Sequence, residues 1–551
     1  MGISEKPCYL PAPCHQPLMP VDVVKVHTAV FSVSDKEGLV DFANKVSSFG
    51  VEILATGGTY AVLKAAGISV KSLQDDMNLP TALSGRVKTL HAPLQAAILA
   101  RRTSNHLKEL REMGVKPVDM VVCNFYPFRE ALRQGAADDA LVESIDIGGP
   151  TMVRAASKNF ESVVVVSSPR LYDTVIEEMK SNGGGTTRGF RRRLAVEAFS
   201  QTSSYDAAIF NGLRHEAAGE FPQKLLMSAS KIQDTKYGEN PDRRAVIYSI
   251  DDWKTMSGWK QLAGDVLSFN NFLDVGSAYD IVEGYDDTTA VATVKHGQIS
   301  GFAFAPTVAE AYTLAHSCDP EADFGGTVVT NREVDAEAAG LIGRNEGAKD
   351  ASVYTEIVMA PGFSAEALAT LERKQKKKIR IIQAGDRPDY PYDLKVVEGA
   401  ILLQDAPDYR AKLDPARITV PTKTKPDPRQ LRKLLAAWEV VRRVQSNGIV
   451  VAEGSFEGER LTRFWTLGVA SFRKRNGAVK IALDNAAGRS KGAVCASDGF
   501  FPFRDSVDLL GQASVSAVIH PGGSVNDKTS IEAADQYGMA MVLTHTRAFK
   551  H

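Results

Sequence analysis

The sequence is poor in cysteine, and its cysteines follow no metal-binding or disulfide spacing. Cys8, Cys14, Cys123, Cys318 and Cys495 are scattered along 551 residues, and no CxxC pair occurs. Zinc cages and disulfide frameworks both depend on characteristic cysteine spacings. The sequence therefore predicts neither, and we expect no catalytic metal.

An excess of one charge and a long apolar run are also missing. Lys and Arg number 65 against 66 Asp and Glu, which gives a formal net charge of −1. A global basic excess would indicate nucleic-acid binding, whereas a local anion site needs no such excess. No apolar run reaches the length of a membrane span, and residues 1–27 have no apolar signal core. We expect a cytoplasmic protein that binds neither nucleic acid nor membrane.

What the chain has instead is the alternation of strand and helix patterns typical of α/β proteins. Its 551 residues exceed a single hydrophobic core, so several domains are expected. Residues 28–36 form an apolar strand pattern with a polar end. A second strand pattern at 51–55 leads into Thr56-Gly57-Gly58-Thr59. Ligands usually bind where such strands end, and backbone N–H groups at a helix start favour phosphate.

Further polar segments occur near predicted strand ends in the first half. They are residues 85–91 (GRVKTLH), 124–128 (NFYPF) and 145–151 (IDIGGPT). Because ligands collect at strand ends in α/β folds, we interpret these segments as parts of one shared pocket. Residues 182–188 (NGGGTTR) are interpreted as a flexible loop, and residues 190–213 as a long helix.

The second half is organised around a strand pattern at 289–294 that ends in Lys295 and His296. Histidine can take up and return a proton near neutral pH, and lysine places a cation where negative charge develops. The glycine-rich residues 297–301 and a helix pattern at 309–315 follow. By itself the dipeptide fits a solvated strand end better than a catalytic pair, so other motifs must support the catalytic hypothesis.

Together the motifs resemble one family. In chain order they are FSVSDK, TGGT, GRVKTLH, CNFYPF, IDIGGPT, KYGENP, LSFNNFLD, VKH, DFGGTVVTNREVD, QSNGIV, SDGFFPFRD, PGGSVNDK and TRAFKH. Over residues 28 to 551 this series is similar to the bifunctional purine-biosynthesis family that combines AICAR transformylase with IMP cyclohydrolase. Many motifs in one order are far more specific than any single one.

The resemblance implies the domain organisation. After an N-terminal extension at 1–27, residues 28–225 would form the cyclohydrolase domain, a doubly wound α/β fold similar to methylglyoxal synthase. Residues 226–551 would form the transformylase region, an α/β/α arrangement of two cytidine-deaminase-like subdomains at about 226–420 and 429–551. Family membership also implies a homodimer with transformylase sites between the subunits.

The resemblance further implies that the second half transfers a formyl group to AICAR, giving FAICAR, with 10-formyltetrahydrofolate as co-substrate. His296 would accept the proton of the attacking amine. Lys295 would stabilise the oxyanion or protonate the leaving folate nitrogen, and Asn447 would orient the formyl or carboxamide oxygen. The positions that match AICAR-binding residues of the family are Lys236, Tyr237, Phe324, Gly325, Asp335, Arg475, Phe500, Arg547 and His551.

The first half would then close the ring of FAICAR to IMP with loss of water. The residues that match the family's catalytic set are Lys88, Tyr126, Asp146 and Lys158. The residues that match its phosphate and ribose cradle are Ser32, Ser34, Lys36, Thr56, Gly57, Thr59 and Arg86. Both substrates are small nucleotides, and no partner beyond nucleotide, folate and a second subunit is implied.

The second half departs from the family pattern at several places. Lys236 stands where an arginine is usual, KHGQISG replaces a proline-containing loop, and residues 467–475 (LGVASFRKR) replace a glycine-rich segment after an apparent insertion at 454–465. These changes leave two alternatives. The protein could be a divergent homologue that retains only cyclohydrolase activity or acts on a modified AICAR-like nucleotide, or it could bind nucleotides without catalysis.

Overall fold

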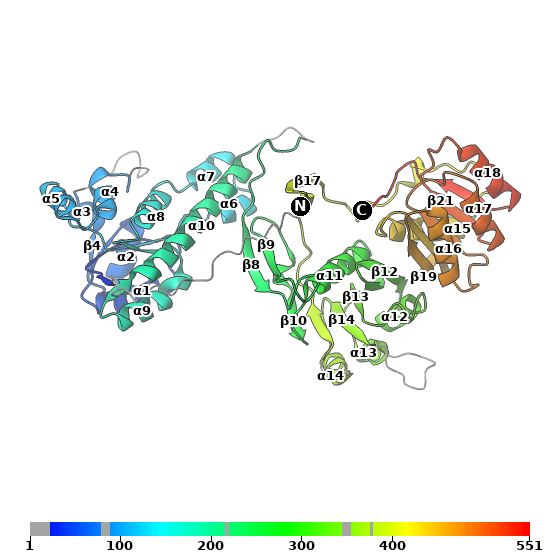
Figure 1. Ribbon diagram of the computed structural model, residues 1–551, viewed down its shortest axis with the longest axis horizontal. Helices are drawn as coiled ribbons and strands as arrows, with labels where there is room; N and C mark the ends of the chain where they lie inside the picture. The colour runs from blue at the N-terminus through cyan, green and yellow to red at the C-terminus, as the bar shows by residue number, and fades with distance from the viewer. Residues whose placement is uncertain (1–22, 79–86, 88, 215–219, 344–353, 375–377) are drawn as a thin grey trace, which may run out of the picture. The chain divides into compact units, whose positions relative to one another are not determined.

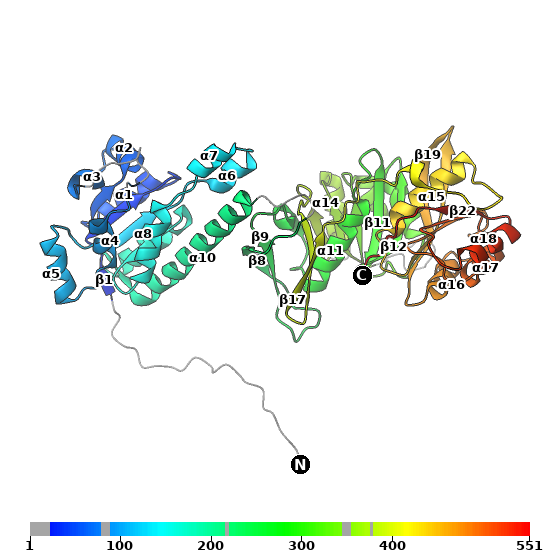
Figure 2. The same cartoon turned by 90° about the horizontal axis from the view of Figure 1, so that it is seen from above.

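The computed structural model describes residues 23–78, 87, 89–214, 220–343, 354–374 and 378–551. The chain divides into two compact units, residues 1–228 and 229–551 (Figures 1 and 2). Each unit has its own sheet and its own hydrophobic core, and each is described by itself.

The first unit is built on a parallel sheet with the strand order β4-β3-β2-β5-β6. The central strands β2 and β5 are buried along almost their whole length, which requires cover on both faces, as in doubly wound folds. The strands of the unit are β1 (Val23–Lys25), β2 (Thr28–Ser32), β3 (Glu52–Ala55), β4 (Val70–Ser72), β5 (Met120–Cys123), β6 (Val164–Val166) and β7 (Gly185–Thr187). Its α-helices are α1 (Leu39–Ser47), α2 (Gly57–Ala65), α3 (Leu73–Asp76), α4 (Ala92–Leu99), α5 (Ser104–Glu112), α6 (Phe128–Arg133), α7 (Asp138–Glu143), α8 (Gly148–Lys158), α9 (Tyr172–Ser181) and α10 (Arg188–Leu213).

Two glycine-containing segments of this unit differ from their sequence-based interpretation. Residues 185–187 form β7, which pairs with β1 at residues 23–25, so part of the expected loop and part of the expected extension are strand. A Cβ at Gly185 would lie 2.6 Å from Val23 Cγ1, so glycine here permits close strand approach. Gly57 and Gly58 form the first turn of α2 and not a separate turn before it.

The second unit contains an eleven-stranded sheet in the order β10-β15-β14-β13-β11-β12-β19-β18-β20-β21-β22. Two further pairs, β8–β9 and β16–β17, form separate antiparallel hairpins. The strands are β8 (Ala229–Asp234), β9 (Val246–Ile250), β10 (Lys260–Ala263), β11 (Thr289–Lys295), β12 (Gln298–Ala305), β13 (Gly326–Thr330), β14 (Thr355–Ala360), β15 (Arg380–Gln383), β16 (Tyr392–Val397), β17 (Ala400–Asp405), β18 (Gly448–Glu457), β19 (Arg460–Ser471), β20 (Val494–Ser497), β21 (Ala517–His520) and β22 (Ala540–Leu543). The α-helices are α11 (Phe269–Val282), α12 (Val308–His316), α13 (Ala336–Leu341), α14 (Ala365–Arg373), α15 (Pro428–Val441), α16 (Arg475–Asn485), α17 (Asp505–Gln512) and α18 (Asp527–Gln536).

The large sheet is made of two copies of one pattern. Each copy has a helix, an antiparallel hairpin, and then three strands that alternate with helices: α11 to β15 in the first copy and α15 to β22 in the second. The two copies join where β12 pairs with β19, at Ala303↔Trp465 and Phe304↔Phe464. The core places α11 and α15 on one face of the sheet, and α12–α14 and α16–α18 on the other. This duplicated α/β/α arrangement agrees with the expected fold class.

One segment of the second unit was misjudged from sequence. Residues 298–305, which include most of the glycine-rich run after His296, form strand β12. Gly301 is needed in β12 because a Cβ would lie 2.0 Å from the Ala315 carbonyl oxygen of α12. Helix packing, not flexibility, explains that glycine. The residues 454–465, interpreted as an insertion, lie in the β18–β19 hairpin.

A buried arginine links the two copies. The guanidinium of Arg443 donates to the carbonyl oxygens of Asp280 (2.9 Å), Glu283 (2.9 Å) and Tyr409 (3.2 Å). Arg443 is 3 % exposed, and its charge is balanced by Glu439 at 3.5 Å. Since α11 carries Asp280 and Arg443 follows α15, this side chain holds the first helices of both copies together.

Replacing Arg443 with methionine should destabilise the second unit, because it leaves the carbonyl groups of Asp280, Glu283 and Tyr409 without this donor. The expected loss is about 3 kcal/mol. All four tryptophans, Trp253, Trp259, Trp438 and Trp465, lie in this unit, so tryptophan fluorescence during urea unfolding reports on it. Arg417→Met, at an exposed arginine paired with Asp414, is the matched control and should unfold like the wild type. Equal midpoints for both variants would contradict the assigned role.

Candidate functional site

The first unit has a cavity of about 580 Å³ at the carboxyl end of its parallel sheet. Parallel strands end at one edge, so the residues after β2, β3 and β5 meet there, beside the start of α8. The cavity is lined by Ser32, Val33, Ser34, Lys36, Thr56, Gly57, Gly58, Thr59, Thr89, Asn124, Tyr126, Val142, Glu143, Ile145, Asp146, Ile147, Gly148 and Gly149. Eight of the residues expected from sequence are therefore brought together.

One end of this cavity is suited to bind an anion. The backbone N–H groups at the start of α2 are next to hydroxyl groups, and Thr56 Oγ1 donates to Ser32 Oγ at 3.0 Å. The Lys36 ammonium donates to the carbonyl oxygen of Ser34 at 3.2 Å, and burial lowers the pKa of Lys36 below its usual range. Helix start, hydroxyls and a partly buried cation together make a cradle whose chemistry suits an anion such as a phosphate group.

Asn124 supports this cradle and was not assigned a role from the sequence. Its Oδ1 accepts hydrogen bonds from the backbone N–H groups of Ser34 (2.6 Å) and Asp35 (2.9 Å). Its Nδ2 donates to the Asp35 carbonyl oxygen at 3.1 Å. The signal available in the sequence was its position directly after the apolar residues 120–123.

The other end of the cavity carries acid–base groups. Asp146 Oδ1 accepts from the N–H of Gly149 at 2.8 Å, at the start of α8. Burial raises the pKa of Asp146, and backbone N–H groups, first that of Gly149, partly oppose the rise. Burial and then the charge of Asp146 raise the pKa of Tyr126. The backbone N–H of Asp146 donates to the Tyr205 hydroxyl oxygen at 2.8 Å, which orients this segment. Tyr205 lies within the long helix α10, where no local sequence signal marked it.

Lys158 lies away from this cavity. It is the last residue of α8, about 15 Å along the helix from the Gly148 end, because each residue adds 1.5 Å. It lines a different cavity, of about 750 Å³, with Arg154, Arg192 and Phe199. A single chain therefore does not bring Lys158 to Asp146. Lys88 and Arg86 lie outside the described residues.

In the second unit, Lys295 and His296 are part of a tight hairpin turn. Lys295 pairs with Gln298, and both intervening residues have positive φ angles, 52° at His296 and 71° at Gly297. This two-residue turn has the geometry favoured in β-hairpins. The turn is anchored because Asp274 Oδ1, from α11, accepts the N–H of Gly297 at 2.6 Å. The His296 side chain is exposed.

Lys295 joins this turn to the loop before β13. Its Nζ donates to the carbonyl oxygen of Phe324 at 2.7 Å. Phe324 is 59 % exposed, and Gly325 has a φ of 76°, which favours glycine. Phe324 and Gly325, both expected as AICAR-binding positions, thus lie beside Lys295.

Asn447, Arg475 and Phe500 line a cavity of about 470 Å³ in the second unit. Its walls come from the start of β18, the start of α16, the loop after β20 and the C-terminal tail. The remaining lining residues are Arg473, Lys474, Asn476, Pro502, Phe503, Asp505, Ser506 and Phe549. Exposed aromatic rings and cations in one hollow suit a flat, negatively charged ligand.

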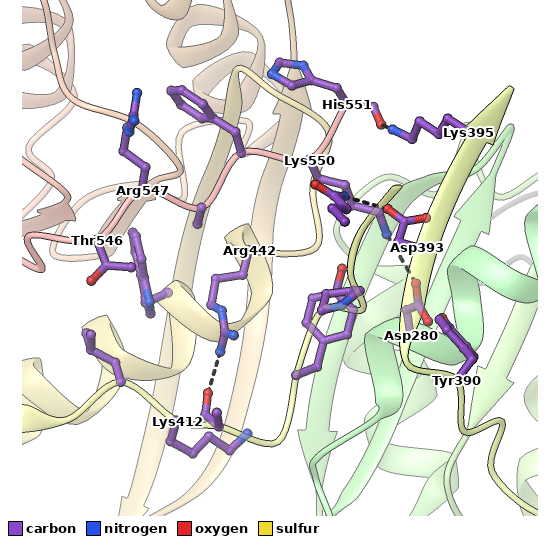
Figure 3. Close-up of a pocket in the computed structure, with 18 of the residues that line it drawn as sticks. Asp280, Tyr390, Asp393, Lys395, Lys412, Arg442, Thr546, Arg547, Lys550 and His551 are labelled. Carbon is purple, nitrogen blue, oxygen red and sulfur yellow. Dashed lines mark hydrogen bonds and ion pairs between the residues drawn. The ribbon is translucent and has the colours of Figure 1, made fainter. Parts of the chain in front are cut away.

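Arg547 and His551 line another cavity of the second unit, of about 930 Å³, on the sheet face that carries α11 and α15 (Figure 3). Phe549 lines both this cavity and the preceding one, so the tail separates them. Burial raises the pKa of Asp280 in this cavity, and Lys550, whose Nζ lies 3.4 Å from Asp280 Oδ2, opposes the rise.

The expected transformylase residues do not form one cluster within the chain. β11 and β18 are three strand spacings apart in the sheet, about 14 Å, so Lys295–His296 and Asn447 are separated. Tyr237 lies at the start of α11, where its carbonyl oxygen accepts the N–H of Phe269 at 3.1 Å, and Lys236 pairs with Asp265 at 3.7 Å.

Asp335 lies at the opposite edge of the sheet from Lys295. It follows β13, which runs antiparallel to β11. Its Oδ1 accepts the N–H of Ala338 at 2.8 Å and caps α13. The expectation that Asp335 shares a site with Lys295 is not met within one chain, because antiparallel neighbours end at opposite edges.

Neither a metal site nor a membrane-spanning helix occurs in the described part of the chain. Among those residues, no group of three or more His, Cys, Asp or Glu side chains is placed to hold a metal ion. Nor does any described helix combine the length and apolar character needed to cross a membrane.

Comparison with known proteins gives two family matches. A model of the AICARFT/IMPCHase bienzyme matches residues 156–483, and a model of the MGS-like domain matches residues 38–151. The protein named bifunctional purine biosynthesis protein PurH from Acetivibrio thermocellus is 40 % identical over 536 residues, which cover 96 % of this chain and 100 % of the relative. The PurH protein of Listeria monocytogenes serotype 4b is 40 % identical over 531 residues, covering 95 % and 99 %. A solved structure titled "Crystal structure of ForH" is 35 % identical, covers 34 % of this chain and all of that chain, and has a TM-score of 0.31.

Proposed function

The chain belongs to the AICARFT/IMPCHase bienzyme family, and we propose from this that it is a bifunctional purine-biosynthesis enzyme with AICAR formyltransferase and IMP cyclohydrolase activities. The observation that carries the proposal is 40 % identity to a bifunctional relative over 96 % of this chain. The two units, residues 1–228 and 229–551, are assigned ring closure and formyl transfer respectively.

Ring closure fits the cavity of the first unit. The carboxamide nitrogen of FAICAR attacks the formamide carbon, and the former formyl oxygen leaves as water. The nitrogen must lose protons while the oxygen gains them. Asp146 and Tyr126, whose pKa values are both raised, are placed for this exchange, and the nucleotide phosphate is held at the start of α2. Lys88 remains a proposed participant, outside the described residues.

Formyl transfer is assigned to the second unit, with 10-formyltetrahydrofolate as the proposed co-substrate. The AICAR amine attacks the formyl carbon, loses its proton to His296, and the tetrahydrofolate nitrogen leaves with a proton. Asn447 and Lys295 would stabilise the oxyanion that forms on the formyl oxygen. The aromatic and cationic lining around Phe500 supports folate binding there.

A homodimer would complete both sites. Lys295–His296 and Asn447 are about 14 Å apart at their strands, and Lys158 lies away from Asp146, so a second chain can supply the missing partners. The β16–β17 hairpin exposes four apolar side chains, Val396, Val397, Ile401 and Leu402, of which Val396 is 77 % exposed. Such a patch on a hairpin is suited to cover by a second copy. Light scattering should give twice the chain mass of 59.6 kDa; a monomer at micromolar concentration would reject this assignment.

Two assays test the proposal. One mixes the protein with AICAR and 10-formyltetrahydrofolate and follows tetrahydrofolate release, and the other adds FAICAR and follows IMP. Both activities are expected. Ring closure alone would support a divergent homologue, and activity with neither substrate, together with tight nucleotide binding, would support a non-catalytic binder.

A further inference from the structure

Arg475 does not present its guanidinium to the cavity as a free phosphate ligand. It is 8 % exposed, and both of its terminal nitrogens, Nη1 and Nη2, donate to protein groups. Nη1 donates to Asp498 Oδ1 at 2.5 Å and to Ser497 Oγ at 2.7 Å, and Nη2 donates to Asn447 Oδ1 at 2.6 Å. The resemblance places Arg475 among the AICAR-binding positions, and these hydrogen bonds leave only part of its guanidinium for such a ligand.

The partner of Arg475 is deeply buried. Asp498 is 0 % exposed and also accepts a hydrogen bond from the Ser446 hydroxyl. A buried carboxylate opposite a buried guanidinium forms a rigid pair, because separating the charges in a poorly solvated region is costly. The pair joins the end of β20, the start of α16 and the residue before β18, and so connects three elements around Asn447.

The hydrogen bonds around Arg475 determine which way the Asn447 side-chain amide points. A guanidinium can only donate, so it must face the Asn447 oxygen. On the other side, Asn447 Nδ2 donates to the carbonyl oxygen of Phe472 at 3.0 Å, and a carbonyl can only accept. One Nδ2–H remains unused, and Asn447 lines the cavity. The side chain thus offers the cavity a hydrogen-bond donor in a fixed orientation.

We propose that Arg475 is a positioning residue that acts on formyl transfer through Asn447: paired with buried Asp498, it orients the Asn447 carboxamide and polarises its free N–H toward the oxyanion of the transferred formyl group. A cation bound to an amide oxygen draws electron density from the amide and strengthens the N–H as a donor. The positive charge of Arg475 thereby reaches the oxyanion without direct contact. This inference depends on the proposed formyltransferase function.

Lysine at position 475 tests the inference. Arg475→Lys keeps the charge but cannot bond Asp498, Ser497 and Asn447 in the same planar arrangement. We expect kcat for formyl transfer to fall by roughly 100-fold, as when one oxyanion donor is lost, with less than about a threefold change in KM for AICAR. Ring closure by the same preparation should be unchanged. A tenfold rise in KM with kcat retained would show that Arg475 binds the nucleotide directly, which would overturn the inference.

A double-mutant cycle separates positioning from general structural support. If Arg475 acts through Asn447, the double variant Asn447→Ala with Arg475→Lys should be no slower than Asn447→Ala alone. If instead the two substitutions slowed formyl transfer independently, so that the rate reductions of the single variants multiplied in the double variant, the inference would be overturned. Lys480→Gln removes an exposed cation from the same helix, α16, and serves as the matched control with wild-type kinetics.

A milder variant covers the case in which Arg475→Lys does not fold. Ser497→Ala removes one of the groups that hold Nη1, and we expect a drop in kcat of roughly three- to tenfold that disappears in the Asn447→Ala background. A drop of equal size in both backgrounds would count against the inference. The proposed function is tested separately from this inference: it would be rejected only if the wild-type protein transferred no formyl group.

Discussion

Replacing His296 with asparagine should abolish formyl transfer, by at least about 1000-fold, and leave ring closure at the wild-type rate. The imidazole is proposed to accept the proton that the AICAR amine loses, and asparagine cannot do so. Asparagine is a better test than alanine because His296 has a φ of 52°, a backbone conformation that asparagine tolerates. The turn and the Asp274–Gly297 hydrogen bond should therefore remain.

The measurement is folate release with AICAR and 10-formyltetrahydrofolate, alongside IMP formation from FAICAR by the same preparation. His106→Ala, at a histidine of α5 in the first unit, is the matched control and should leave both activities unchanged. If His296→Asn transferred formyl at the wild-type rate, His296 would not be the base, and the exposed turn would be only a β-hairpin connection.

Replacing Asp146 with asparagine should have the opposite effect: ring closure falls by roughly 1000-fold and formyl transfer remains. Asparagine retains an oxygen that can accept the Gly149 N–H, so the start of α8 should keep its structure. What the variant loses is the ability to exchange a proton with the FAICAR amide. Asp139→Asn, at an exposed aspartate in α7, is the control and should close the ring normally.

The pH dependence of the wild-type enzyme provides a second measurement on Asp146. Because burial raises its pKa, the carboxylate needed to accept a proton is lost at a higher pH than for an ordinary aspartate. The ring-closure rate should fall as the pH is lowered through this raised pKa, and Asp146→Asn should lack that limb in any residual rate. If the decrease in rate at low pH persisted unchanged in Asp146→Asn, another ionisable group would be responsible for it.

The same shift predicts the effect on stability. The folded-state pKa lies above the unfolded value, so the unfolded state ionises first as the pH rises. Ionisation of Asp146 therefore costs stability once the pH passes the unfolded pKa, and the full cost is present above the folded pKa. Asp146→Asn should be at least as stable as the wild type at pH 7, as thermal unfolding of the first unit would show. A large loss of stability would indicate that Asp146 mainly supports the fold.

The sequence was informative where a residue's role depends on its place relative to a strand end. Ser32 and Thr56 lie at the ends of parallel strands, and such ends meet at one edge whatever the details of packing. Asp146 was also expected near a strand end, but it lies between α7 and α8 and reaches the cavity at the start of α8. The same reasoning was weaker in the second unit. Its sheet mixes parallel and antiparallel pairs, so chain order does not show which edge a residue such as Asp335 occupies.

Glycine-rich segments were the least predictable part of the fold. Residues 185–187 were expected to belong to a flexible loop and residues 298–301 to a glycine-rich segment after a strand, and both lie in strands. Gly185 permits the close approach of Val23, which is far away in the sequence. Gly301 permits the close approach of the Ala315 carbonyl group, which belongs to a neighbouring helix. Composition reports that a backbone position is unusual, but the neighbour that requires glycine is known only once the chain is folded.

The sequence by itself determined the alternation of strands and helices, the ordered series of motifs and, through them, the family to which the chain belongs. Only the tertiary structure decided that Arg475 is held by Asp498 and orients Asn447, that Lys158 lies away from Asp146, and that His296 occupies a two-residue turn anchored by Asp274. The reason is physical. Local patterns follow from the period of strand and helix, whereas the partner of a buried charge or the edge reached by a side chain depends on contacts between residues far apart in the chain.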